Sequence, residues 1–181
     1  VSSDPAVVTA AERVVFPGQS AMHDCMREIE QRGLRAAVLD AARNKPFLRI
    51  CIGQQMLFEH SEEGNIDGLA VFRGSVRRFP AERMRDHAGG KLKVPHMGWN
   101  EVQQQNPHPL WNGIAHGARF YFVHSYYADP VDAACIVGST EYGLRFTSAV
   151  ARDNIFAIQC HPEKSAVAGL ALLANFVAWK P

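Results

Sequence analysis

Short apolar runs alternate with amphipathic stretches in the first third of the chain. Val14–Phe16 and Phe47–Ile50 have the length and the β-branched or aromatic content of buried strands, and each runs into a glycine-containing turn. Between them, Met22–Gln31 and Leu34–Arg43 show helical spacing of apolar residues, with a glycine separating the two. The pattern predicts one more helix, from Gln54 to about His60. This part of the chain therefore indicates strands that alternate with helices.

The rest of the chain is richer in strands and ends in a helix from about Ser165 to Trp179. Val1–Pro5 resembles the tail of a strand that enters a turn. Since no repeat, low-complexity run or linker is visible, we expect one domain over residues 1–181, an α/β fold with a partly parallel sheet. The further strands predicted are Gly74–Phe79, Phe120–Ser125, Cys135–Gly138, Leu144–Val150 and Ile155–Gln159.

Composition narrows the class of protein. The 181 residues carry a formal net charge of +1, with 47% apolar and 20% charged residues, which excludes a disordered chain. No basic excess is available to neutralise phosphates, so we expect no nucleic-acid partner. No apolar run is long enough to cross a bilayer, and the N-terminus does not read as a secretory signal. We therefore expect no membrane partner.

The four cysteines are Cys25, Cys51, Cys135 and Cys160, and none is close to another in sequence. Metal sites use short ligand spacing, so we expect no metal site. A reduced, cytoplasmic protein with one working thiol is the better interpretation.

Cys51 lies at a predicted strand-to-helix turn, with Gly53 two residues later. This is the setting of a nucleophile elbow, in which the side chain stands above the sheet at the start of a helix. Unpaired N–H groups at the helix N-terminus favour the thiolate, and the N–H of Ile52 is placed to bind an oxyanion. The alternative is a buried core cysteine.

The segment Cys160–Glu163 contains a second candidate group. Pro162 favours extended geometry, so His161 and Glu163 are expected to project together, and the carboxylate would hold the imidazole as a general base. With Cys51 they would supply a nucleophile, a base and an orienting acid. The alternative is a surface turn before a helix. Most of the other histidines, His96 among them, lack such an acidic neighbour and are expected to face solvent or the backbone.

Gly18 and Gln19 follow the strand Val14–Phe16 in a tight turn. Such a turn can present backbone N–H groups to an anion. Taken in isolation, it also reads as a simple connection between a strand and a helix.

Taken together, these residues resemble the class I, triad-type glutamine amidotransferases. Within that class, three segments resemble the glutaminase subunits of imidazole glycerol phosphate synthase, and the similarity extends over essentially the whole chain. The segments are Pro95-His96-Met97-Gly98-Trp99-Asn100, Tyr121-Phe122-Val123-His124-Ser125-Tyr126 and Gln159-Cys160-His161-Pro162-Glu163-Lys164-Ser165.

The resemblance implies a three-layer fold with a mixed, mostly parallel central sheet. It also implies that Cys51 attacks the side-chain amide of glutamine, that His161 moves the proton and that Glu163 orients His161. The oxyanion hole would come from the N–H groups of Ile52 and of the Gly18–Gln19 turn. The residues that match positions around the glutamine substrate are Gln55, Glu63, His124, Ser125 and Tyr126.

The resemblance further implies a heterodimer without a cofactor. Ammonia would pass to a separate cyclase subunit, where a lyase-type reaction of histidine biosynthesis forms imidazole glycerol phosphate. Trp99 and Lys164 match positions at that interface. Their alternatives are a half-buried aromatic residue and a solvated lysine.

Two substitutions and the start of the chain depart from the family pattern. Arg49 stands at the first glycine of the family's Gly-x-Cys-x-Gly elbow, and it must point elsewhere or disturb the site, so reduced activity is expected. Ser20 replaces a glycine after the oxyanion turn. The family begins with a strand, a turn and a helix before the point where this chain starts, so we expect this chain to lack the family's first strand and helix.

Four readings of the function follow. The leading one is an enzyme subunit that hydrolyses glutamine for a partner synthase. The runner-up is a degenerate, weakly active subunit that mainly binds the cyclase. An amidotransferase of purine or tryptophan synthesis is disfavoured by Pro95–Asn100, and nothing in the sequence suggests the peptide-binding groove of a free cysteine protease.

Overall fold

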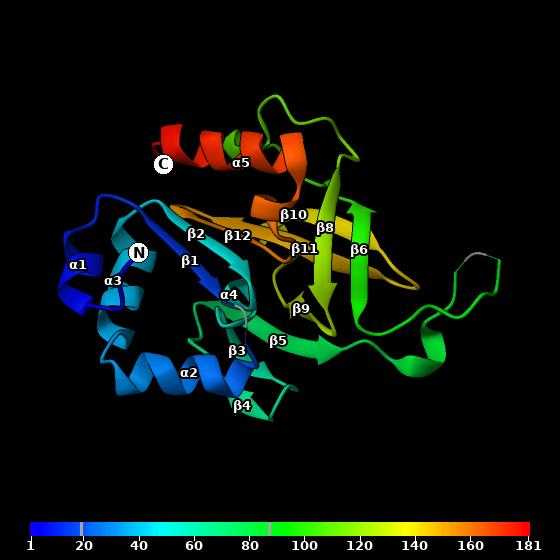
Figure 1. Cartoon of the computed structure of the whole chain (residues 1–181), viewed down its shortest axis with the longest axis horizontal. Coiled ribbons are helices and arrows are strands. Elements are labelled where there is room, and N and C mark those ends of the chain that lie inside the picture. Colours follow the sequence, from blue (N-terminus) through cyan, green and yellow to red (C-terminus); the bar gives the residue numbers. More distant parts are fainter. Residues whose placement is uncertain (19, 87) are drawn as a thin grey trace.

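The computed structural model describes residues 1–18, 20–86 and 88–181 (Figure 1). A ten-stranded mixed sheet forms its centre, and β6 (His96–Glu101) and β8 (Arg119–His124) form a separate antiparallel pair. The strands of the large sheet are β1 (Val14–Gly18), β2 (Phe47–Cys51), β3 (Phe58–Ser61), β4 (Ile66–Asp67), β5 (Phe72–Arg78), β7 (Gln103–Gln104), β9 (Tyr126–Pro130), β10 (Ile136–Glu141), β11 (Arg145–Arg152) and β12 (Ile155–Ile158).

Five α-helices and four short 3₁₀ helices connect the described strands. None of the helices in the described ranges is both long enough and apolar enough to cross a membrane. The α-helices are α1 (Pro5–Ala10), α2 (Met22–Gln31), α3 (Arg35–Asn44), α4 (Ile52–Gln55) and α5 (Ala166–Ala178), and the 3₁₀ helices are η1 (Ala81–Arg83), η2 (Pro109–Trp111), η3 (Ala133–Cys135) and η4 (Pro162–Lys164).

The strand order in the main path of the sheet is β1-β2-β12-β11-β9-β5-β3-β4. The pairs β1–β2, β2–β12 and β3–β5 are parallel, and the other pairs along this path are antiparallel. The predicted α/β class with a mixed sheet is confirmed. The sheet differs from the expected, mostly parallel one in one detail. Antiparallel pairings outnumber parallel ones among the described strands, and two of the three parallel pairings lie at β1, β2 and β12.

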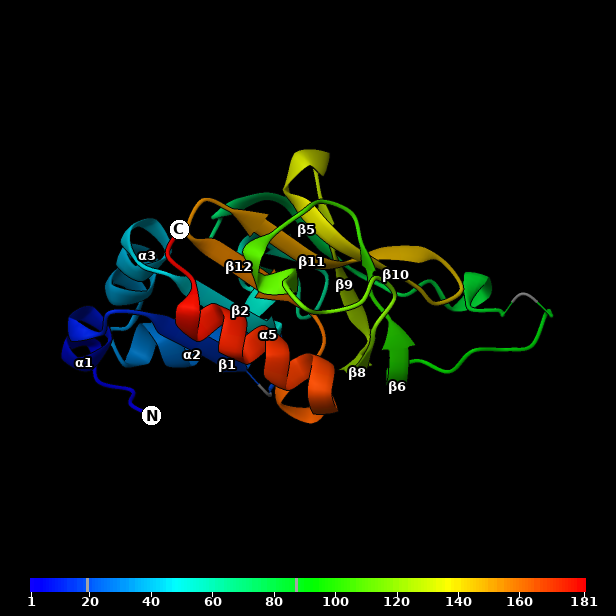
Figure 2. The ribbon, with the colours of Figure 1, turned by 90° about the horizontal axis from the view of Figure 1, so that it is seen from above.

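Helices cover both faces of the sheet and give the expected three layers (Figures 1 and 2). α2 and α3 pack on one face, and α5 packs on the other. β12 alternates between the two resulting cores, since Ile155 and Ala157 belong to one and Phe156 and Ile158 to the other. This alternation is the two-residue period of a strand that is buried on both sides.

The helix predicted from Gln54 to His60 is wrong beyond its first turn. α4 ends at Gln55, and β3 begins at Phe58 and pairs with β5. The apolar run Met56–Phe58 is buried from every side, so it has no amphipathic period that could separate helix from strand.

The first residues also differ from the prediction of a strand tail. They lead into α1, which Asp4 caps by accepting a hydrogen bond from the backbone N–H of Ala6 at 2.8 Å. Pro5 occupies the first turn, where its missing N–H is no loss. The Asp-Pro pair was thus a helix-start signal. Strands β6 and β9 were not predicted either, because their apolar positions are interrupted by glycine, tyrosine and aspartate.

Arg49 lies fully buried in β2, on the face opposite the Cys51 side chain. Its Nε donates to the Gly53 carbonyl oxygen at 2.7 Å, and the guanidinium carbon lies 4.0 Å from the centre of the Phe16 ring. The two terminal nitrogens make no hydrogen bond with any described residue. Burial lowers the pKa of the guanidinium to about 9, still above neutral pH, so the core carries a positive charge.

We predict that Arg49→Met raises the free energy of unfolding by about 1–3 kcal/mol at pH 7. Methionine fills a similar volume, and the change removes a buried charge with two unbonded nitrogens. Urea denaturation measures the effect, with the exposed Arg145→Met as the matched control. An unfolding midpoint below that of the unmodified protein would contradict the prediction.

Candidate active site

The carboxyl ends of three parallel strands meet at one edge of the sheet. Gly18 ends β1 and is paired in register with Cys51 at the end of β2. β12 runs parallel to β2 on its other side, with Ile158 opposite Ile50, and its chain continues directly into His161. Segments distant in sequence are therefore brought together by strand register alone.

Cys51 has the turned backbone of a nucleophile elbow, with φ 57° and ψ −120°. As a result, Ile50 and Cys51 both face the same core, although consecutive residues of a regular strand face opposite sides. Gly53 allows the turn to pass close to β1, because a β-carbon at this position would lie 2.5 Å from the Phe16 carbonyl oxygen. The predicted elbow is present even though Arg49 replaces the family's first glycine.

The Cys51 thiol is largely buried, and its chemistry depends on nearby donors. Burial raises its pKa to about 11, while hydrogen bonds from the Ile52 backbone and the Gln159 side chain act in the opposite direction. Arg49 is not among the groups that shift it. At neutral pH the sulfur therefore carries its proton, and a nearby base is needed to remove it.

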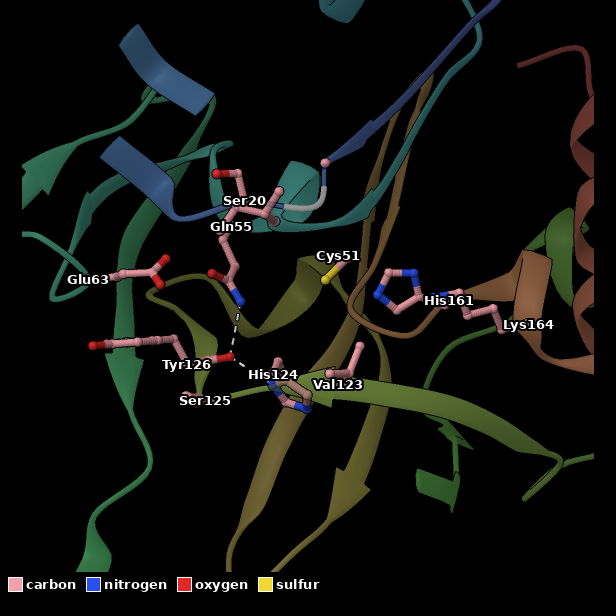
Figure 3. Close-up of a pocket in the computed structure, with 12 residues that line it drawn as sticks. Ser20, Cys51, Gln55, Glu63, Val123, His124, Ser125, Tyr126, His161 and Lys164 are labelled. Atoms are coloured by element: carbon pink, nitrogen blue, oxygen red, sulfur yellow. Dashed lines mark hydrogen bonds between the residues drawn. The ribbon is translucent and has the colours of Figure 1, made fainter. Parts of the chain in front are cut away.

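His161 lies beside this sulfur, and its ring faces Cys51 (Figure 3). The distance between His161 Nδ1 and Glu163 Oε1 is 2.7 Å. Because a carboxylate only accepts, Nδ1 carries the hydrogen and Nε2 has the free lone pair. Nε2 is buried and makes no hydrogen bond with any described residue. The geometry gives His161 an unoccupied basic nitrogen.

The backbone around His161 is fixed from two sides. Its N–H donates to the Tyr121 carbonyl at 2.9 Å, and the Ser165 hydroxyl donates to its carbonyl oxygen at 2.5 Å. A β-carbon on Gly169 in α5 would lie 1.9 Å from the Pro162 carbonyl oxygen, so only glycine lets the helix approach this closely. The segment that carries the imidazole is therefore held between β8 and α5.

A pocket of about 360 Å³ opens in front of the Cys51 sulfur. Nearly all the residues that were predicted to bind or react lie on its wall (Figure 3), and Glu163 contacts His161 on that wall. The lining residues are Gly18, Ser20, Cys51, Ile52, Gln55, Glu63, Val123, His124, Ser125, Tyr126, His161 and Lys164.

Two of the predicted substrate-binding residues also hold the protein together. Gln55 Nε2 donates to the Tyr126 carbonyl oxygen at 3.0 Å and to Gln159 Oε1 at 2.9 Å. Glu63 Oε2 accepts the backbone N–H of Met22 at 2.9 Å, at the start of α2. Gln55 Oε1 and Glu63 Oε1 make no hydrogen bond within the described ranges, so each side chain has one free acceptor oxygen.

Only part of the predicted oxyanion hole lies within the residues that the structure describes. The backbone N–H of Ile52 acts to lower the pKa of the Cys51 thiol. A β-carbon on Gly18 would lie 2.0 Å from the Ile52 Cγ2 atom, so this approach requires glycine. Gln19 lies outside the described residues. The hydroxyl of Ser20, the second departure from the family pattern, donates to Asp24 Oδ2 at 3.3 Å.

Of the two predicted interface residues, Lys164 lies on the pocket wall and Trp99 does not. Trp99 and Met97 project from the same face of β6, with relative exposures of 45% and 62%. β6 pairs along its length with β8, and Val123 and His124 of β8 line the pocket. The two side chains therefore form an exposed apolar pair on the strand next to β8.

Sequence reasoning missed two residues at the site. Gln159 is fully buried, with Nε2 3.8 Å from the Cys51 sulfur, and its only signal was its place just before the His-Pro-Glu motif. His96 was expected to face solvent or the backbone. It is instead buried against His124, with Nδ1 3.0 Å from His124 Nε2. Only pairing of β6 with β8 brings these two histidines together.

Comparison with known proteins agrees with this geometry. The family model described as glutamine amidotransferase class-I matches residues 7–179. The imidazole glycerol phosphate synthase subunit HisH of Dechloromonas aromatica (strain RCB) is 67% identical over all of this chain and 84% of that protein. The protein of the same name from Aromatoleum aromaticum is 66% identical over all of this chain and 85% of that protein.

Solved structures show the same fold at low identity. A solved glutamine amidotransferase has a TM-score of 0.68 at 12% identity, covering 97% of this chain and 85% of that one. The glutaminase domain of Trypanosoma brucei CTPS, solved with bound acivicin, has a TM-score of 0.60 at 17% identity, covering 98% of this chain and 75% of that one. The chain therefore belongs to the class I glutamine amidotransferase family.

Proposed function

We propose that this chain is the glutaminase subunit of an imidazole glycerol phosphate synthase and that residues 1–181 act as one catalytic domain. Relatives with that subunit name match the whole chain at 67% and 66% identity. The chemistry rests on one observation above all: His161 has Nδ1 bonded to Glu163, and its Nε2, which has no hydrogen-bond partner among the described residues, lies beside the Cys51 sulfur.

In the proposed first half-reaction, Cys51 Sγ attacks the side-chain carbonyl carbon of glutamine and His161 Nε2 takes the thiol proton. The N–H of Ile52, with a second donor from the Gly18–Gln19 turn, stabilises the oxyanion. His161 then protonates the amide nitrogen, the C–N bond breaks, and ammonia leaves a thioester. Water that His161 deprotonates hydrolyses the thioester to glutamate and restores the thiol.

The proposed substrate contacts follow from the pocket wall. The Glu63 carboxylate supplies negative charge for the α-ammonium group of glutamine, and Gln55 Oε1 is a further acceptor. His124, Ser125 and Tyr126 form the opposite wall. They come from β8, from the start of β9 and from the residue between these strands, so the substrate would lie between the sheet edge and the β6–β8 pair.

We propose that the cyclase subunit is the partner and that it docks over β6 at Trp99, with Lys164 at the entrance. Ammonia would react there with the phosphoribulosyl formimino intermediate, giving imidazole glycerol phosphate and an aminoimidazole carboxamide ribotide. No cofactor takes part in the steps proposed for this chain. The four free cysteines fit the reducing conditions of the cytoplasm, which we include in the proposal.

A weakly active subunit that mainly binds the cyclase is the second candidate. The high pKa of the Cys51 thiol favours it, because little thiolate exists at neutral pH. Arg49 gives it less support than the sequence suggested, since its side chain faces away from the pocket.

We predict that Cys51→Ala lowers glutamate release from glutamine, measured in the presence of the cyclase, by about 10³-fold or more. The reason is that no other group can form the thioester. Cys25→Ala, at a half-buried thiol outside the pocket, serves as control and should keep its activity. If the unmodified chain binds the cyclase but releases no Cys51-dependent glutamate, the weakly active subunit is the correct reading.

We predict that Glu163→Gln lowers kcat by about 10²- to 10⁴-fold with little change in KM. The amide can turn its NH₂ group towards Nδ1, which puts the hydrogen of His161 on Nε2 and removes the base. Steady-state kinetics with the cyclase present measures the effect. A kcat within about threefold of the unmodified enzyme would show that the carboxylate does not orient His161.

A further inference from the structure

A set of buried amide and imidazole groups connects the substrate wall to the nucleophile, and none of them has a role in the bond changes above. Gln159 is the member of this set that lies beside the nucleophile. Its Nε2 lies 3.8 Å from the Cys51 sulfur, and its Oε1 lies 2.9 Å from Gln55 Nε2. Its backbone N–H donates to the Ser148 carbonyl at 2.8 Å, so the residue is fixed to β11.

The Tyr126 carbonyl oxygen decides which way the amides point. A carbonyl can only accept, so the Gln55 atom 3.0 Å from it must be the NH₂ group. That same NH₂ group faces Gln159, so the Gln159 atom opposite it must be the oxygen. The NH₂ group of Gln159 is then left facing the Cys51 sulfur. The orientation follows from donors and acceptors alone.

The same carbonyl is held from its other side by His124 (Figure 3), which is in turn bonded to His96. His124 Nδ1 donates to it at 2.7 Å, so His124 Nε2 accepts from His96 Nδ1 at 3.0 Å. Burial lowers the pKa of His96 to about 4 and that of His124 to about 3, so both rings are neutral and each has one donor and one acceptor. Asn100 Nδ2 lies 3.3 Å from the remaining acceptor, His96 Nε2.

The rings are also fixed by packing. His96 stacks on Tyr142 at a centroid distance of 3.9 Å and on Phe122 at 4.8 Å. His124 packs against Phe79 and Phe146 at centroid distances of 5.2 and 5.1 Å. The Tyr126 carbonyl is therefore bonded on one side to Gln55 and on the other to a packed histidine.

We propose that Gln159 is a positioning residue that directs an N–H at the Cys51 sulfur, its amide orientation being fixed through Gln55 by the Tyr126 carbonyl. A catalytic role for this hydrogen bond rests on the proposed glutaminase function. The hydrogen bond favours thiolate over thiol, because a charged acceptor bonds more strongly than a neutral one. It also keeps the sulfur at the pocket wall, where His161 faces it.

The test uses Gln159→Met, which keeps the shape and removes the donor. Gln54→Met is the matched control, because Gln54 is a neighbouring, fully buried glutamine with no hydrogen-bond partner in the described structure. Alkylation of Cys51 by iodoacetamide is followed between about pH 7 and 9.5 by peptide mass spectrometry. Throughout this range the rate rises with pH in the unmodified protein, since the thiol titrates above it.

We predict that Gln159→Met lowers the Cys51 alkylation rate by about tenfold at each pH, while Gln54→Met leaves it unchanged. In the glutaminase assay with cyclase, kcat should fall by a similar factor with KM within about threefold. A merely structural role would change the thermal midpoint but leave alkylation of the folded protein unaltered. An unchanged Cys51 rate in folded Gln159→Met overturns the proposal.

Gln159→Glu keeps the test decisive if the methionine variant does not fold. Glutamate keeps an oxygen for Gln55 but turns a second oxygen towards the sulfur, so alkylation should be slowed at least as much. Unslowed alkylation in this variant overturns the proposal as well. Because alkylation needs no turnover, it tests Gln159 even if the unmodified protein releases no glutamate, an outcome that would count against the proposed function alone.

Discussion

The backbone at Cys51 has φ 57° and ψ −120°, a conformation that costs a non-glycine residue on the order of 1–3 kcal/mol. It persists because β2 lies between β1 and β12 and is buried along its whole length. The turn places the sulfur on the α5 side of the sheet, facing the segment that follows β12. Without it, Cys51 would lie on the same side as Arg49 and away from His161.

The strained backbone at Cys51 is held in place by close approaches that only glycine permits. Gly53 lets α4 pass the Phe16 carbonyl, Gly18 lets β1 approach Ile52, and Gly169 lets α5 approach Pro162. The first two contacts hold α4, which directly follows Cys51, against β1, and the third holds α5 against the segment that follows His161. The three together fix the nucleophile and the base to the same rigid edge, which is how a site gains positional precision from its scaffold.

Most of the buried polar side chains near the site have hydrogen-bond partners. Gln55, Gln159, His96 and His124 each find partners of the correct kind, so their burial adds rigidity. Gln54 and Arg49 are the contrast, because they bury polar atoms without partners among the described residues. Gln55 and His124 of this network line the pocket, whereas Arg49 and Gln54 do not.

Much of this protein could be predicted from local sequence. The strand, turn and glycine around Cys51 predicted the elbow, because it depends on neighbours in the chain. His161 and Glu163 do meet, at 2.7 Å, but the extended geometry predicted for their segment ends at His161 and is wrong beyond it, because Pro162–Lys164 form the 3₁₀ helix η4. The short apolar run after Gln55 could not be assigned, since a segment buried on all sides has no period.

The sequence by itself singled out Cys51, His161 and Glu163 as the candidate reacting groups and predicted the sharp turn at Cys51. Only the tertiary structure decided that Arg49 faces away from Cys51, that Gln159 reaches the sulfur, and that His96 pairs with His124. These facts depend on strand order and on which side of the sheet each side chain takes. Contacts between residues far apart in the chain, such as Cys51 and Gln159, leave no periodic signal in the sequence because only the packed sheet brings the two together.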